Sequence, residues 1–311
     1  MPQNVLRPSA TRYTRFTDHL RQTFACRVHK VCIDAGFTCP NRDGTVAQGG
    51  CIYCNNVSFS PGNRRVSVRE QIDQGTHFLR KRYKADKFIA YFQAYTNTYG
   101  DIRLLKSLYD EALRSDDIVG LSIGTRPDCV PDEVLDMLAD YASRTYVWLE
   151  LGLESGHDQT LALINRGHTV AAFDDAVRRA QQRGLQLCAH VILGLPGESP
   201  AAMLATARHL AALRLDAVKL HHLHVVRHTV LEKMYRRGEV ALLSLDEYAA
   251  LVVDCLEVLP PEMIIMRLMG DAPRDTLVAP SWSLHKQAAL QRIEQELVQR
   301  DTYQGKYYAS E

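Results

Sequence analysis

Short apolar runs alternate with amphipathic stretches along most of the chain. From residue 88 onward the apolar runs are KFIAYFQAY, IVGLSIGT, TYVWLELGL, LQLCAHVILGL and DAVKLHHLHVV, and segments with helical spacing lie between them. A further apolar run at 28–35, followed by the helical stretch VREQIDQGTHFLRKRYK, makes six β/α units with short connections. This pattern favours an α/β fold in which a parallel sheet curls into a partial or full barrel.

The pattern changes after residue 235. It becomes a helical stretch, LSLDEYAALVVDCLEVL, then the apolar run EMIIMRLM, a Pro-rich loop and a final helical stretch, SLHKQAALQRIEQELVQR. We therefore expect residues 1–235 to form the barrel with an N-terminal segment, and residues 236–311 to form a C-terminal α/β extension packed on it. In a barrel of this kind the functional residues gather at the C-terminal ends of the strands.

The composition is ordinary for a globular protein. Hydrophobic residues make up 46% and charged residues 23% of the 311 residues, so neither disorder nor a fibre is indicated. No apolar run approaches the roughly 18 residues of a membrane span, and the N-terminus lacks the apolar core of a secretory signal. We expect a cytoplasmic protein with no membrane partner.

Charge is distributed unevenly along the chain. Residues 1–90 hold 15 Lys and Arg against 6 Asp and Glu, a net charge of +9, whereas the remaining residues hold 22 against 30, a net charge of −8. This asymmetry is typical of a basic face for an anionic partner such as RNA. The alternative is two solvated faces of opposite charge that attract each other.

Three cysteines stand in one loop after the first predicted strand. The stretch CPNRDGTVAQGGCIYC contains Cys39, Cys51 and Cys54 among residues typical of a loop. Eight cysteines are sparse for a disulfide-stapled domain of this length, so metal binding or catalysis is the better interpretation. Three thiolates can hold three irons of a 4Fe-4S cluster and leave the fourth iron open to another ligand.

A structural zinc site is the alternative for this loop. Such a site closes with four Cys or His ligands, and here the fourth ligand would have to be Cys26, Cys32 or His29. The spacing alone leaves both interpretations open.

Seven motifs together resemble a known family. They are GFTCPNRDGTVAQGGCIYCN, YFQAYTNTY, GLSIGTRPDCVPD, WLELGLES, INRGHT, LGLPGES and KLHHLHVVRHT. The chain resembles the radical S-adenosylmethionine (SAM) superfamily and, more narrowly, its YhcC group, which is similar to the radical SAM part of the Elongator catalytic subunit. The resemblance implies a partial (β/α)6 TIM-like barrel of the radical SAM type with a C-terminal α/β extension.

The same resemblance implies two cofactors, a 4Fe-4S cluster and SAM. It assigns Cys39, Cys51 and Cys54 as cluster ligands, with the open iron chelating the amino and carboxylate groups of SAM. One electron then cleaves SAM to a 5'-deoxyadenosyl radical that abstracts hydrogen from a substrate. The electron would come from a donor such as flavodoxin or ferredoxin.

Further cofactor-binding residues follow from position in the barrel. Many relatives carry a Gly-Gly-Glu run at the end of the second strand, where this chain has YFQAY, so Gln93 and Thr96 are candidate replacements. At the third strand relatives often carry Glu at the position of Gly124, and Thr125 and Arg126 are the polar residues nearby.

The fourth and fifth strands contribute two pairs of candidates. Glu154 and Arg166 correspond to residues that contact SAM in related enzymes, and an Arg can grip the SAM carboxylate in a forked contact. The alternative is an ion pair between them at the barrel rim. Gly194 and Gly197 permit a close approach to adenine, and a tight turn between strand and helix explains them as well.

The run KLHHLHVVRH carries the catalytic candidates. On a strand of period two, Lys219 and His221 point one way and His222 and His224 the other. We expect Lys219 and His221 to point into the barrel toward substrate.

Two classes of function follow. The leading hypothesis is a radical SAM enzyme that modifies tRNA at a wobble uridine. Within enzymes the alternative is radical SAM chemistry on a small molecule such as a porphyrin precursor. Outside enzymes it is a non-catalytic, zinc-stabilised RNA-binding protein.

Overall fold

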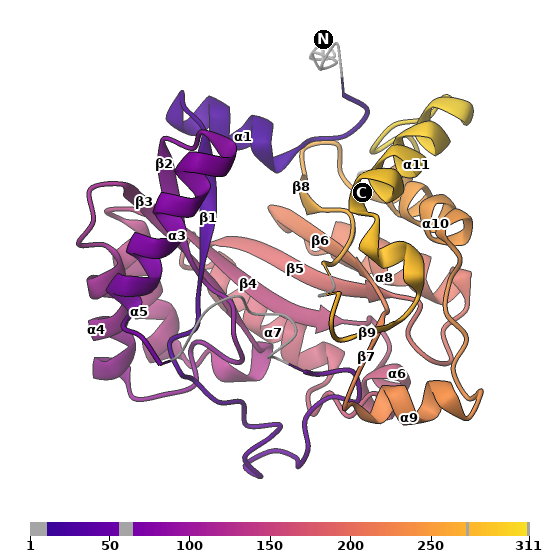
Figure 1. Ribbon diagram of the computed structural model, residues 1–311, viewed down its shortest axis with the longest axis horizontal. Helices are drawn as coiled ribbons and strands as arrows, with labels where there is room; N and C mark the ends of the chain where they lie inside the picture. Colours follow the sequence, from indigo (N-terminus) through magenta and orange to yellow (C-terminus); the bar gives the residue numbers. More distant parts are fainter. Residues whose placement is uncertain (1–10, 56–64, 272–273, 310–311) are drawn as a thin grey trace.

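Seven parallel strands form the main sheet of the protein (Figure 1). The computed structural model describes residues 11–55, 65–271 and 274–309. The strands pair in the order β1-β2-β3-β4-β5-β6-β8. Their bounds are Val28–Ile33 (β1), Lys87–Phe92 (β2), Ile118–Thr125 (β3), Tyr146–Glu154 (β4), Gln186–Leu193 (β5), Ala217–His222 (β6) and Ile264–Arg267 (β8). The expected partial barrel is confirmed.

The seventh strand comes from the segment that we expected to be an extension. β8 lies in the run EMIIMRLM and pairs in parallel with β6, so the C-terminal segment lengthens the sheet. A separate two-stranded ladder joins β7 (Val225–Val226) to β9 (Leu277–Ala279).

Helices cover the outer side of the curled sheet (Figure 1). The helices that follow β1 to β5 are α3 (Val68–Tyr83), α4 (Ile102–Ala112), α5 (Asp132–Ala142), α6 (Asp158–Leu163), α7 (Val170–Gln181) and α8 (Pro200–Ala212), and both α6 and α7 come after β4. The C-terminal helices are α9 (Val230–Arg236), α10 (Leu245–Val258) and α11 (Lys286–Gln299), and α10 packs against α8 and α11. Short 3-10 helices occur at Pro127–Cys129 and Ser281–Leu284.

Local sequence fixes where the long helices begin. Ser67 precedes α3 and Ser244 precedes α10, and each forms a capping box with a Glu three residues later. In each box the Ser hydroxyl oxygen accepts a hydrogen bond from the backbone N–H of the Glu. The Glu carboxylate accepts a hydrogen bond from the backbone N–H of the Ser. The caps satisfy backbone donors that the first turn of a helix leaves without partners.

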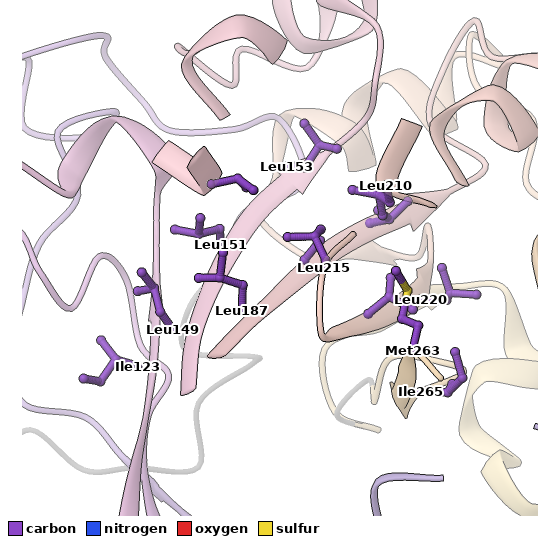
Figure 2. Close-up of a cluster of buried hydrophobic side chains, with 14 of the residues drawn as sticks. Ile123, Leu149, Leu151, Leu153, Leu187, Leu210, Leu215, Leu220, Met263 and Ile265 are labelled. Carbon is purple, nitrogen blue, oxygen red and sulfur yellow. The ribbon is translucent and has the colours of Figure 1, made fainter. Parts of the chain in front are cut away.

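Side chains alternate between the two faces of each central strand. On β4, Leu149, Leu151 and Leu153 are buried in the hydrophobic core beneath the helices (Figure 2). Residues between them, such as Glu150, point to the inner side of the sheet, where Glu150 contacts Lys30 and Lys219. The outer face of the sheet therefore supplies the core, and the inner face is available for a site.

Helix α1 (Phe16–Phe24) closes the N-terminal end of the half-barrel. It packs against β1 and β8, the two edge strands. The ring of Phe16 lies edge-on to Trp148 at 6.1 Å between centroids, and Lys30 Nζ lies 4.9 Å from the Phe16 ring. The inner cavity is therefore covered at the bottom, away from the C-terminal ends of the strands.

Candidate active site

A pocket of about 700 Å³ lies at the C-terminal ends of the strands. The three loop cysteines, Cys39, Cys51 and Cys54, line it together. Also lining it are seven other residues that the sequence predicted, namely Gln93, Thr96, Thr125, Arg126, Glu154, Arg166 and His221. Residues from distant parts of the sequence thus converge on one cavity.

The cluster loop, residues 39–54, is held in place by backbone hydrogen bonds. Its last turn closes through the N–H of Cys54, which donates to the carbonyl of Cys51 at 2.9 Å. The N–H of Ile52 donates to the carbonyl of Ile164 at 3.0 Å, and the Asn165 amide donates to the carbonyl of Gly50 at 2.8 Å. These bonds tie the loop to the segment after β4, so the thiols keep a fixed position.

The surroundings of the thiols suit an iron-sulfur cluster. Asn41 Nδ2 lies 3.5 Å and Arg166 Nη1 lies 3.7 Å from the sulfur of Cys51, and N–H donors of this kind tune clusters. Burial and, to a smaller extent, the neighbouring Cys51 together raise the pKa of Cys54 to about 12. None of the eight cysteines forms a disulfide.

A single metal ion requires several ligand side chains that converge on one point, whereas a cluster does not. Within the described ranges, no group of three or more His, Cys, Asp or Glu side chains is arranged to hold one ion. In a 4Fe-4S cluster each thiolate binds a separate iron, so the thiols need not converge on one point. The donor set and its N–H partners are therefore compatible with the cluster that the sequence predicts.

Arg166 connects the cluster loop to β4. Besides its contact with Cys51, its Nη2 donates to the carbonyl of Gly152 at 2.7 Å and forms an ion pair with Glu154 at 3.2 Å. A Cβ atom added at Gly152 would lie 2.4 Å from Arg166 Nη2, so only glycine permits this approach. The ion pair that we considered as an alternative is present, and SAM contact by these residues stays a prediction.

Glu154 has a backbone conformation that residues other than glycine rarely adopt. Its φ is +70°, at the end of β4 where the pairing with β5 shifts register. Burial raises its pKa above the usual range, although the charge of Arg166 opposes this. Uncommon backbone of this kind persists where the surroundings determine it, and it clusters at functional sites.

Three of the candidates from the second and third strands have side-chain partners within the protein. The Oε1 atom of Gln93 accepts a hydrogen bond from the thiol of Cys32 at 3.3 Å. The hydroxyl of Thr125 lies 2.5 Å from the hydroxyl of Thr98. Arg126 is almost fully buried, and its guanidinium grips both carboxylate oxygens of Asp128 at 2.9 and 2.7 Å. Its third contact, at 2.7 Å, is the carbonyl of Arg166. Arg126 therefore braces the backbone of Arg166.

Three predicted residues lie outside the pocket lining. Gly194 and Gly197 have φ values of +88° and +84° in the turn after β5, which is the tight turn that we considered for them. Lys219 does not line the pocket either, because its side chain lies beneath it and is almost fully buried. Its Nζ donates to Glu150 and, at 3.1 Å, to the hydroxyl of Tyr91.

Glu150 gathers a group of charges on the inner face of the sheet. Its side chain has no exposed surface, and its carboxylate is bound by Lys219, by Lys30 at 2.5 Å and by His190 at 2.7 Å. His221 lies next to His190, with 5.5 Å between ring centroids. These side chains come from four different strands. His190 and His221 line the pocket, and Lys30, Glu150 and Lys219 lie beneath its lining as its base.

Burial and charge set the protonation of this group. Burial alone would raise the pKa of Glu150, but the charges of Lys219 and Lys30 hold it well below its usual value. Burial lowers the pKa of Lys219 to about 8, although Glu150 opposes this. Burial also lowers the pKa of His190 to about 4, helped by the charge of Lys219. At neutral pH Glu150 is therefore negative, Lys219 positive and His190 neutral.

Lys30, Glu150 and His190 were not among the residues that the sequence predicted. A signal for two of them was present, because Glu150 and His190 interrupt the apolar runs TYVWLELGL and LQLCAHVILGL. A charged or titratable residue inside a buried strand points to the inner face when its neighbours pack outward. Only the fold shows that these residues meet.

Comparisons with known proteins agree with this geometry. The Radical SAM superfamily model matches residues 39–210, and the Radical_SAM C-terminal domain model matches residues 215–299. The chain is 42% identical to the uncharacterized protein YtqA of Bacillus subtilis over 96% of this chain and 93% of that protein. It is 40% identical to protein YhcC of Escherichia coli over 91% of each.

More distant relatives match this chain over only part of their own length. The chain is 30% identical to a tRNA uridine(34) acetyltransferase of Dehalococcoides mccartyi over half of this chain and 34% of that protein. The solved structure of Elp3 from Methanocaldococcus infernus shares the fold, with a TM-score of 0.66 at 18% identity over 90% of this chain and 64% of that one. The expected kinship with the YhcC group and with Elongator is confirmed. The chain belongs to the radical SAM superfamily, whose members are enzymes that bind a 4Fe-4S cluster and SAM.

Proposed function

We propose that this protein holds a 4Fe-4S cluster on Cys39, Cys51 and Cys54 and cleaves SAM reductively to a 5'-deoxyadenosyl radical. The observation that carries this proposal is the convergence of the three thiols on one pocket, with Arg166 beside the sulfur of Cys51. A bound cluster would supply the electron that SAM cleavage needs. The protein itself fixes the thiols, covers the cavity from below and offers Arg166 and Glu154 as polar partners for SAM.

We further propose that the radical acts on tRNA, at a wobble uridine. Two observations support this substrate: the partial similarity to a tRNA uridine(34) acetyltransferase, and the +9 charge of residues 1–90. A basic surface favours binding to the RNA backbone. We propose a cytoplasmic location and a donor such as flavodoxin or ferredoxin. Among the described residues no helix has the length and apolar character to cross a membrane.

Anaerobic reconstitution tests the chemistry. We expect the purified protein to take up iron and sulfide and, with reductant, to release 5'-deoxyadenosine from SAM. Cys51→Ala should abolish cluster formation, whereas Cys26→Ala, a change of the same type outside the loop, should leave it intact. Stoichiometric zinc without sulfide, together with no cleavage of SAM, would refute the radical function.

Nucleoside analysis tests the substrate. Cells that lack the gene should lose one modified uridine from their tRNA, and the gene for the Cys51→Ala variant should not restore it. An unchanged nucleoside profile in a strain whose enzyme cleaves SAM would exclude tRNA and favour a small-molecule substrate such as a porphyrin precursor.

A further inference from the structure

The base of the pocket contains more positive than negative charge. Lys30 and Lys219 both bind the single carboxylate of Glu150, and a third cation, Arg267, lies close enough to Lys219 to act on its charge. Arg267 lines the pocket and lies 3.6 Å from Asp271. Arg267 keeps 27% of its side-chain surface exposed, so its positive charge, added to that of the two lysines, is accessible from the cavity and favours an anionic ligand.

The other carboxylates of the pocket are already bound to cations. Asp271 is bound by Lys286 at 2.7 and 3.0 Å, closer than its contact with Arg267. Glu154 is paired with Arg166 near the cluster loop. Within the described lining, Arg267 therefore shares its carboxylate partner, Asp271, with Lys286.

His221 adds a donor or acceptor that the protein leaves unused. Its Nε2 is shielded from solvent and has no hydrogen-bond partner within the part of the chain that the structure describes. Its other ring nitrogen lies against Gly270, where an added Cβ atom would come within 3.2 Å. A buried polar atom without a partner costs free energy, and a ligand in the pocket would satisfy it.

The charged base and the cysteines belong to the same cavity. Cys39, Cys51 and Cys54 line one part of the pocket and His190, His221 and Arg267 another. Because α1 covers the bottom of the half-barrel, a ligand reaches the base through the end where the cysteines lie. A molecule held there would lie beyond the SAM-binding part of the pocket.

We propose that Arg267 and His221 form a binding subsite for an oxyanion, the carboxylate or phosphate group of a small molecule. The guanidinium offers a forked pair of N–H donors that matches either group, and the neighbouring Lys219 and Lys30 add positive potential from below. A nucleobase is uncharged at neutral pH, so the base that the radical would modify is not the group held here, and we assign the subsite to a small anionic substrate or co-substrate. The inference rests on the proposed function only in placing this molecule next to SAM.

Calorimetric titration of the reconstituted enzyme tests the subsite. The probes are succinate, inorganic phosphate and, as the uncharged counterpart of succinate, succinamide. We expect saturable binding of at least one of the two anions and none of succinamide. Arg267→Gln should weaken anion binding on the order of tenfold or more, as loss of a charge-assisted hydrogen bond does, and Arg267→Lys should weaken it less.

The matched control is Arg237→Gln, which changes an exposed arginine paired with Glu239 outside the pocket. It should bind the anions as the unchanged protein does. Circular dichroism melting of each variant reports folding, and 5'-deoxyadenosine release reports the proposed chemistry separately. Equal affinity in the Arg267→Gln variant, equal binding of succinamide, or no saturable binding of either anion by the unchanged protein would overturn the proposal, even in an enzyme that cleaves SAM normally.

Discussion

The two faces of β4 share one backbone and have opposite chemistry. The outward side chains Leu149, Leu151 and Leu153 are packed among apolar residues of neighbouring strands and helices (Figure 2). The inward Glu150, one residue from two of these leucines, binds two lysines and a histidine. Alternation in a strand thus lets the sheet build a hydrophobic core on one side and a charged pocket on the other.

Because of this difference, the outer face of the sheet mainly determines the stability of the fold, and the inner face mainly determines ligand binding. The outer face contributes mainly by removing apolar surface from water, an effect that does not depend on pocket charge. The inner face holds charges that stabilise the fold only while they remain paired. Substitutions on the two faces should therefore be distinguishable by their consequences.

Glu150→Gln gives the largest expected change in stability. It leaves Lys219 and Lys30 buried without their carboxylate, so we expect the free energy of unfolding to fall by about 3–5 kcal/mol. Urea unfolding at pH 7 measures it, with Glu239→Gln as the exposed control that should leave the midpoint unchanged. An unfolding free energy equal to or above that of the unchanged protein would show that Glu150 is not what holds the two lysines.

Leu149→Ala tests the outer face. Loss of a fully buried leucine should lower the free energy of unfolding by about 2–5 kcal/mol, because it removes apolar contacts and leaves a cavity. Binding of succinate or phosphate, in contrast, should keep its affinity in calorimetry below the melting temperature. A loss of anion affinity comparable to that of Arg267→Gln would mean that the two faces are not independent.

The pH dependence of anion binding gives the smallest expected effect. The pKa of Lys219 is lowered by burial to about 8, so the residue loses its positive charge between pH 7 and 9. Anion affinity should fall across this window by about fivefold, since one of three cations is lost. The other charged and titratable groups that face Lys219 are Glu150, Lys30, Arg267, His190, His221, Cys32, Cys188 and Tyr91.

Titrations with succinate at intervals between pH 7 and 9 measure this dependence. Succinate itself keeps both charges in this range, and the pKa of His190 lies well below it. A flat affinity would show that the charge of Lys219 does not act on the subsite.

The sequence was informative wherever the signal was local. Strand and helix periodicity predicted the β/α units, and the spacing of Cys39, Cys51 and Cys54 predicted where a pocket would form. The pairing of β8 with β6 was not predictable, because pairing depends on contacts between distant segments rather than on the pattern inside either one.

The same limit applies to individual side chains. Lys219 was expected to point inward, and it does, but nothing in its own strand indicates that its partner is Glu150 on β4. Arg126 was expected near the cofactor, and its grip on Asp128 follows only from the turn after β3. Which polar groups remain available to a ligand is decided by such tertiary contacts.

The open edges of the sheet have a consequence for how new specificities arise. In a closed eight-stranded barrel the interior is filled by side chains. Here β1 and β8 are the edges of a sheet that does not close, and the cavity of about 700 Å³ lies on its inner side. Because the sheet stays open between β1 and β8, its inner side has room for a second molecule beside SAM. Residues such as His221 and Arg267 can change with the substrate while the leucine core that holds the sheet stays the same.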